Sequence, residues 1–174
     1  LSGPTTTYYG TSNFEAYSGV QVDNSGDLWV VGYSSNPANT VAANSDLTLR
    51  KFGSTGNTVV LGPFTRAAHI KGDNDLEGAA VLGADGLYWA GGRYNSQNNR
   101  DLTLVKWDAS GNVLYERNWH DSVNGGDDAG SGIAINPVTN RIYVANARSG
   151  NVSVIEGVTH DVLATVAVGI WPVS

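Results

Sequence analysis

The sequence contains no cysteine among its 174 residues. This absence excludes disulfide bonds, thiolate metal ligands and thiol catalysis, and it leaves the redox compartment undecided. Basic residues are also few, with ten lysines and arginines against sixteen aspartates and glutamates, and they are scattered along the chain. A net charge of -6 without a basic cluster argues against a nucleic-acid-binding surface, so we expect no nucleic-acid partner.

Long hydrophobic runs are absent as well. No stretch approaches the roughly 18 uninterrupted apolar residues of a membrane-spanning helix, so no membrane span is expected. The composition, 41% hydrophobic and 15% charged, is that of an ordinary folded protein. The chain begins with Leu1 rather than methionine, and we expect that something upstream has been removed.

What the chain does have is an internal repeat at an offset of 55 residues. The run DLTLRKF at 46–52, followed by Gly56-Asn57, returns as DLTLVKW at 101–107, followed by Gly111-Asn112. Helical periodicity is almost absent, whereas short alternating segments separated by Gly, Asn, Asp and Ser recur, which is typical of antiparallel strands and tight turns. Units of four short strands at this spacing predict an all-β fold of propeller blades.

The repeats predict a single domain over residues 1–174 with about three four-stranded antiparallel blades. We expect the blades at about 15–62, 76–119 and 130–168, and at 4–10 an outer strand of a preceding or partner blade. Closed propellers need roughly four to eight blades, so three leave apolar sheet faces open to water. We therefore expect an open array or one completed by oligomerisation, as a ring or as a filament.

Two stretches resemble known propeller repeats. The run SGVQVDNSGDLWVVG at 18–32 resembles the SBBP-type β-propeller repeat, which we assign within 5–118, and the second copy there is weaker. The runs IAINPVTNRIYVAN at 133–146, GNVSVI at 150–155 and VAVG at 166–169 resemble the YVTN β-propeller repeat, assigned to 131–169. The resemblance implies a propeller fold and an extracellular or cell-surface location, and neither repeat type brings catalytic residues with it. Leu82, where the first copy has Asp23, departs from the pattern.

Two loops that enter first strands are acidic and suggest calcium. Calcium takes roughly six to eight oxygen ligands, and these glycine-rich loops offer several, although their spacing does not match the calcium-binding loop that closes with Glu. Asp and Asn also build turns without any metal, and we prefer that interpretation. We therefore expect no cofactor, with calcium as the alternative, and its candidate ligands are Asp73, Asp75, Glu77, Asp127 and Asp128.

Aromatic and histidine residues supply the other candidates for a site. Trp119, Tyr94 and Trp171 lie outside the predicted strand interiors and suit stacking on sugar rings, whereas the three tryptophans within predicted strands, Trp29, Trp89 and Trp107, are predicted core residues. The three histidines lie near different inter-strand connections and lack a nucleophile motif, so they are predicted to be surface residues: His69, His120 and His160.

These observations favour a non-enzymatic propeller protein of the extracellular space or cell surface. Its expected function is protein–protein interaction or self-assembly, as a structural filament or surface-layer component, with an assembly strand at Thr5, Thr6, Thr7, Tyr8 and Tyr9. One alternative is a lectin-like propeller that binds glycans or other ligands. Another is a metal-dependent lyase or hydrolase. The sequence leaves the partner, the number of blades in the intact particle and the choice between ring and filament open.

Overall fold

The computed structural model describes residues 15–35, 45–56, 58–66, 75–94, 100–119, 129–146 and 149–169. Within these residues the chain forms strands and turns and no helix. Glycines with positive φ close several turns, for example Gly26 at 82° and Gly111 at 83°, a conformation that other residues rarely adopt. The strands are β1 (Glu15–Val22), β2 (Leu28–Ser35), β3 (Ser45–Phe52), β4 (Val59–Arg66), β5 (Asp75–Gly83), β6 (Gly86–Tyr94), β7 (Arg100–Trp107), β8 (Val113–Trp119), β9 (Gly130–Ile135), β10 (Ile142–Asn146), β11 (Asn151–Ile155) and β12 (Val162–Ala167).

The strands form three four-stranded antiparallel sheets, each built from consecutive strands. Sheet 1 has the order β1-β2-β3-β4, sheet 2 the order β5-β6-β7-β8, and sheet 3 the order β9-β10-β11-β12. The expectation of an all-β chain with three four-stranded antiparallel units is therefore confirmed. The predicted outer strand at 4–10 lies outside the described residues. Nowhere in the described part of the chain is there a helix of the length and hydropathy that a membrane span requires.

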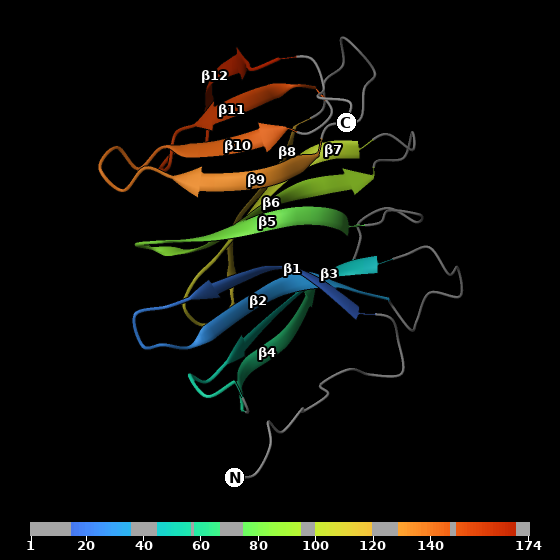
Figure 1. The fold of residues 1–174 in the computed structure, drawn as a ribbon, viewed down its shortest axis with the longest axis vertical. Coiled ribbons are helices and arrows are strands. Elements are labelled where there is room, and N and C mark those ends of the chain that lie inside the picture. Colours follow the sequence, from blue (N-terminus) through green and yellow to red (C-terminus); the bar gives the residue numbers. More distant parts are fainter. Residues whose placement is uncertain are drawn as a thin grey trace.

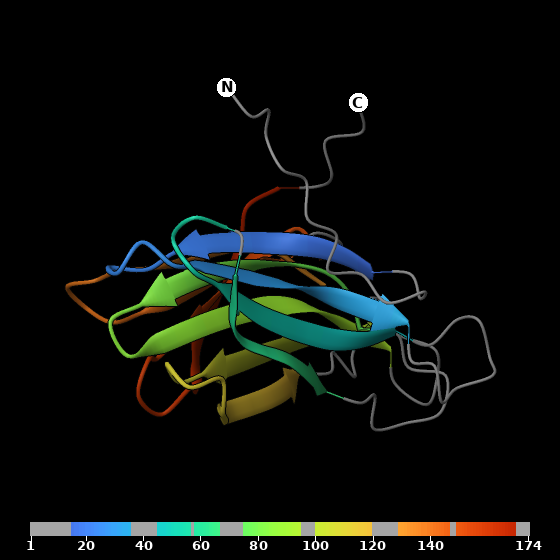
Figure 2. The ribbon, with the colours of Figure 1, turned by 90° about the horizontal axis from the view of Figure 1, so that it is seen from below.

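The three sheets are stacked in chain order along the long axis of the molecule (Figure 1). The first strands of the sheets make the closest contact, because β5 packs against β1 on one side and β9 on the other. These first strands run in the same direction (Figure 1), and the view along the stack shows the strands of sheet 1 lying over those of sheet 2 (Figure 2). Sheet 2 is thus covered on both faces, whereas sheets 1 and 3 end the stack.

Each interface in the stack joins the same two kinds of sheet face. We call the face turned toward the following sheet in sequence the C-side face, and the opposite one the N-side face. The first core cluster places Trp29, Val31, Leu47 and Leu49 from the C-side face of sheet 1 against Leu87, Trp89, Val105 and Trp107 from the N-side face of sheet 2. The second places Tyr88, Ala90, Leu102 and Leu104 of sheet 2 against Ile142, Val144 and Ile155 of sheet 3.

The first strand of every sheet carries a bulge beside a glycine. Pairing slips between Tyr17 and Gly19 in β1, between Leu76 and Gly78 in β5, and opposite Ala145 and Asn146 in β9. A bulge sharpens the local twist of a strand. Because a bulge beside a glycine recurs in every first strand, with that of β5 shifted by one position, it is part of the repeated unit rather than a local irregularity.

Candidate functional site

In sheet 1 a lysine–carboxylate pair joins the turn between β1 and β2 to β3. The Lys51 ammonium lies 2.8 Å from Asp23, 3.0 Å from Asp27 and 5.1 Å from the centre of the Trp29 ring. Asp23 also accepts hydrogen bonds from the Trp29 indole N–H and from two backbone N–H groups of the turn. The hydrogen bond from Lys51 is the main cause that lowers the pKa of Asp23 to about 2. Asp23 is therefore ionised at neutral pH and holds the turn in place.

Sheet 2 has the same kind of pair but takes its carboxylate from another turn position. The Lys106 ammonium of β7 lies 2.6 Å from Asp85 and 4.9 Å from the centre of the Tyr88 ring. Asp85 also accepts a hydrogen bond of 2.9 Å from the Tyr88 hydroxyl. Leu82 pairs with Leu87 as Val22 pairs with Leu28, so the strand register puts Gly83, and not the expected Leu82, at the position of Asp23. Leu82 packs on the opposite, N-side face. The carboxylate has thus moved into the tight turn, while the lysine and the aromatic ring kept their places.

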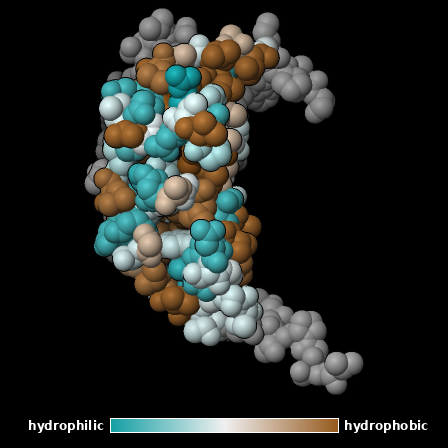
Figure 3. All heavy atoms as spheres, turned by 90° about the vertical axis from the view of Figure 1, so that its left-hand side faces the viewer, coloured by the Kyte–Doolittle hydropathy of each residue, from teal (hydrophilic) through white to brown (hydrophobic). Residues whose placement is uncertain are grey.

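A cleft of about 430 Å³ opens between the turns of sheets 1 and 2. Three carboxylates, Asp23, Asp85 and Asp108, line it together with Lys51. Asp108 accepts hydrogen bonds from two backbone N–H groups and from the Asn112 side chain, all within the β7–β8 turn. The first two carboxylates are held by their lysines. These polar groups bind one another and stabilise the turns that surround the cleft. The cleft lies on the side of the molecule that Figure 3 shows.

The prediction that His160 is a surface residue is wrong. His160 lies in the turn between β11 and β12, is only 8% exposed, and stacks on Tyr115 of β8 with ring centres 3.8 Å apart. Its burial, followed by the positive charge of Lys106, lowers the pKa of the imidazole, so His160 is neutral at pH 7. The next residue, Asp161, pairs with Arg117 of β8 at 3.2 Å. These contacts join the outer strand of sheet 2 to sheet 3.

Among the predicted ligand-binding aromatics, Trp119 is the one whose side chain the structure describes. It ends β8, packs partly buried against the second core cluster, and lies 5.5 Å from the Arg117 guanidinium carbon. Tyr94 ends β6 with a side chain outside the described residues, and Trp171 lies outside them altogether. The prediction for the strand tryptophans is confirmed, since all three are buried: Trp29, Trp89 and Trp107.

The predicted calcium ligands lie almost wholly outside the described residues. Asp75 and Glu77 belong to β5, but their side chains are not described. Within the described part of the chain, no three His, Asp or Glu side chains come close enough to hold a metal ion. The calcium hypothesis thus stays a prediction. Also outside the described residues are Asp73, Asp127, Asp128, His69, His120 and the predicted assembly strand Thr5, Thr6, Thr7, Tyr8 and Tyr9.

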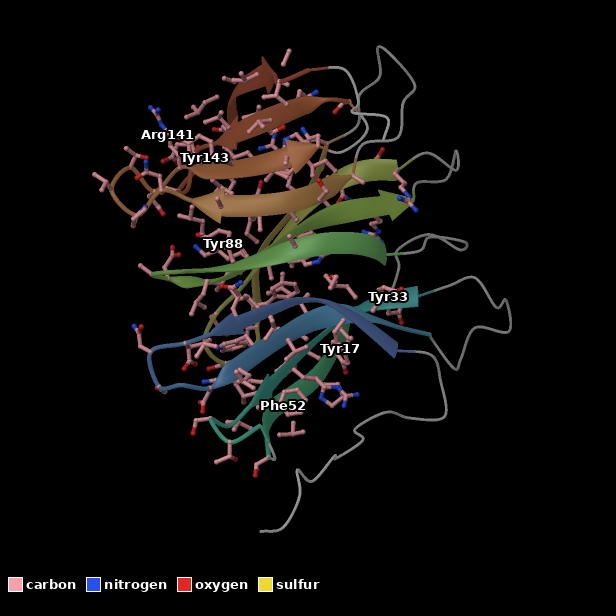
Figure 4. All side chains as sticks on the ribbon, viewed as in Figure 1. Tyr17, Tyr33, Phe52, Tyr88, Arg141 and Tyr143 are labelled. Carbon is pink, nitrogen blue, oxygen red and sulfur yellow. The ribbon has the colours of Figure 1, made fainter. Side chains whose placement is uncertain are left out.

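The C-side face of sheet 3 is the most unusual surface of the described chain. Two rows of paired residues cross all four strands there, and every member is apolar or glycine. The rows are Ala134–Tyr143–Val154–Ala164 and Gly132–Ala145–Val152–Val166. None of these residues is fully buried, and Val166 is 48% exposed. Tyr143 is labelled on β10 in Figure 4, and hydrophobic side chains gather at the upper end of the molecule in Figure 3, where sheet 3 lies.

The opposite end of the stack also presents apolar residues. On the N-side face of sheet 1, Val20 and Val22 of β1 are each 60% exposed. They pair with Val30 and Leu28 of β2, which are half-buried. Farther out on this face, Arg50 of β3 is buried. The exposed apolar area of sheet 1 is therefore concentrated on its first two strands.

Sequence reasoning predicted uncovered faces but did not locate them. The signal was present in β10 and β12, where both alternating sets of residues are mainly apolar, and in the valines of β11 that lie on the same face, Val152 and Val154. A strand with one face in water normally alternates apolar and polar residues. Neither a known protein-family profile nor a curated protein sequence matches the chain.

Proposed function

We propose that this chain is an array of propeller-type blades that functions in protein–protein association, and that its copies associate through the sheet faces at the two ends of the stack. The propeller arrangement is supported by the closely packed first strands β1, β5 and β9, from which each sheet extends outward. An extracellular or cell-surface location is part of the proposal and rests on the resemblance to SBBP-type and YVTN repeats.

The observation that carries the proposal is the pair of apolar rows that cross the C-side face of sheet 3. In sheets 1 and 2 the equivalent row includes Lys51 or Lys106, and the next sheet covers it. Sheet 3 has Val154 at that position. A face that ended in water would gain from a charged residue here, whereas a face that is buried against another sheet gains from valine.

The occupant that we propose for this face is the N-side face of sheet 1 in a second copy. Both interfaces join a C-side face to an N-side face, and among the described residues the two end faces of the stack are one of each kind. A third contact of this kind between two copies continues the established packing. If the rotation closes, two copies make a ring of six sheets, and if it does not, the contact propagates a filament.

The test is one added charge on the open face of sheet 3. Ala145 is exposed in the single chain, so Ala145→Asp is compatible with folding but places a carboxylate inside the proposed contact. We expect association to weaken about 100-fold because a buried, unpaired charge is costly. The matched control is Val138→Asp in the β9–β10 turn, where the side chain is 90% exposed and outside the contact.

The measurement is the mass of the purified chain across a concentration series by light scattering, with circular dichroism to verify folding. The wild type and Val138→Asp should associate, and Ala145→Asp should be shifted toward the single chain. A wild type that stays a single chain throughout, or an Ala145→Asp variant that associates like the control, contradicts the proposal.

A further inference from the structure

The outermost strand of sheet 3, β12, is an unprotected sheet edge. It pairs with β11 on one side and is the end of its sheet among the described residues. All six of its side chains are exposed, and none is charged. Its sequence, Val-Leu-Ala-Thr-Val-Ala, is rich in β-branched and apolar residues and lacks proline and glycine. Such an edge is a template for pairing with another strand.

The outer strands of the other two sheets carry protection that β12 lacks. In β4, Pro63 has no backbone N–H to offer, and the pairing with β3 is twice irregular. In β8, Glu116 and Arg117 stand in the middle of the strand. Charges, proline and irregular pairing are the usual means by which edges avoid pairing. The outer strands of sheets 1 and 2 are therefore protected against edge pairing, and the outer strand of sheet 3 is not.

The backbone of β12 alternates between groups bound to β11 and groups that point outward. The Val168 N–H donates to the Gly150 carbonyl at 3.0 Å, so the N–H groups of Val166 and Ala164 also point toward β11. It follows that Thr165 and Ala167 direct their N–H and C=O groups away from the sheet.

We propose that β12 pairs antiparallel with β12 of a second copy, across a two-fold axis at Val166. In this register Thr165 of one copy faces Ala167 of the other, and the two outward-pointing residues exchange hydrogen bonds at both places. Two copies of sheet 3 then form one continuous sheet. The contact is made by the sheet edge and does not depend on stacking of the sheet faces, so it goes beyond the association proposed above.

A second copy suits this edge because the strand is complementary to itself. The stretch from Ala164 to Val168 is uncharged, so the two-fold axis brings no like charges together. Asp161 lies three positions before this stretch and stays outside the pairing. A two-fold contact also needs only one surface, used by both copies, and therefore closes without propagating.

Cysteine crosslinking tests the register, since the chain has no cysteine of its own. In Val166→Cys the two thiols meet at the axis, where opposite Cα atoms of such a pair are about 4.5 Å apart and within disulfide reach. In the control Ala164→Cys, on the same strand face, the two thiols are four positions apart along the strands, about 13 Å. We expect a disulfide-linked dimer from Val166→Cys under mild oxidation and at least tenfold less from Ala164→Cys. Equal yields, or none from Val166→Cys, overturn the proposal.

Proline at the edge tests the backbone pairing. Thr165→Pro removes an outward N–H and leaves the hydrogen bonds between β12 and β11 in place, while Thr165→Val changes the side chain and keeps the N–H. We expect the Val166→Cys crosslink to form about 30-fold less efficiently with Thr165→Pro and unchanged with Thr165→Val. Undiminished crosslinking with Thr165→Pro contradicts the pairing, and if that variant fails to fold, the comparison of Val166→Cys with Ala164→Cys still decides.

Two further variants separate this contact from other associations. Ala145→Asp, which disrupts the proposed face contact, should leave the Val166→Cys crosslink intact. Mixing full-length chains that carry Val166→Cys with chains that carry Tyr8→Cys tests whether the predicted strand at residues 5–9 occupies this edge instead. A mixed disulfide formed in preference to the Val166→Cys dimer overturns the two-fold pairing.

Discussion

Sheets 2 and 3 have the same strand order and a bulge in the first strand, yet they differ on the face turned toward a following sheet. In sheet 2 the row through Tyr88 contains Lys106, which Asp85 holds and sheet 3 covers. In sheet 3 the corresponding row keeps the aromatic ring as Tyr143 but has Val154 in place of the lysine. The row on the covered face thus contains a charge, and the corresponding row on the open face contains none.

This difference is the reverse of what exposure to water would favour. A lysine on a buried face needs a carboxylate beside it. Sheet 2 lacks a carboxylate at the position of Asp23, and Asp85 from another position of the turn takes that role. On an open face a lysine would need no partner and would improve solubility. Its replacement by Val154 therefore favours a partner on this face, and the comparison can be tested by substitutions at matched positions.

The largest expected effect comes from the glycines beside the bulges. On the covered C-side face of sheet 1, a Cβ at Gly19 would lie 2.8 Å from the Ala80 Cβ and 3.1 Å from the Ala80 backbone nitrogen of sheet 2. Gly19→Ala is therefore expected to lower the free energy of unfolding by about 3 kcal/mol. At Gly132, the matching position on the open face of sheet 3, the nearest atom is the Ala145 Cβ at 3.7 Å. Gly132→Ala should change the free energy by less than about 1 kcal/mol.

Urea unfolding of the two glycine variants measures this difference. Equal losses of stability would mean that the C-side face of sheet 3 is as tightly packed at this position as the covered C-side face of sheet 1, which would contradict the difference between covered and open faces. A stabilised Gly132→Ala variant would agree with it, because alanine restricts the unfolded chain when the folded chain has room.

A smaller effect is expected from the lysine–carboxylate pair of sheet 2. The Lys106 side chain is 9% exposed and that of Asp85 is 51% exposed. Asp85→Asn leaves a buried ammonium without its carboxylate and should cost about 1–3 kcal/mol. Lys106→Met removes the buried charge and leaves Asp85 in contact with water, so it should cost less than Asp85→Asn. Urea unfolding of both variants at neutral pH decides, and the opposite order would contradict the prediction.

The sequence predicted the strands well because their signals are local. Alternating apolar residues and glycine-containing turns mark each strand, and the repeat at 46–52 and 101–107 identifies third strands in two sheets. It did not predict that Asp85 replaces Asp23, because the two carboxylates reach their lysines from different positions in turns of different length. Such a substitution is visible only when the turn and the third strand are seen together.

A short repeat within sheet 3, which sequence reasoning did not predict, concerns the turn that contains the buried His160. The turns of sheet 3 share Val-Thr at 138–139 and 158–159, and each is capped by one side chain, Asn136 or Glu156, that accepts two backbone N–H groups. The residue after Val-Thr has positive φ in both turns: 54° at Asn140 and 59° at His160. Asn and His are both enriched in this conformation, and the histidine of the second turn also stacks on Tyr115.

The smallest expected effect is a pH dependence of stability, which follows from the histidine at position 160 where the other turn has Asn140. The charged groups around His160 are Lys106 and Arg117 on sheet 2, Asp85 in the turn of that sheet, and Glu156 on its own turn. Burial and Lys106 lower the pKa of His160 below its ordinary value of 6.5, so the unfolded chain binds this proton more readily than the folded one. The contribution of His160 to stability is therefore fully present above pH 6.5 and is lost as the pH falls toward the lowered pKa.

His160→Asn tests this dependence, because asparagine is the residue that the sister turn uses at the same φ. Urea midpoints measured at about pH 7.5 and about pH 5 should fall more for the wild type than for the variant. His69 and His120 are present in both proteins, so the difference between the two curves isolates His160. Parallel curves would mean that His160 takes up its proton without loosening the contact between sheets 2 and 3. The position of the imidazole would then be determined by its own turn. The contact with Tyr115 of sheet 2 would stabilise the outer edge of sheet 3 less than the stacked geometry implies.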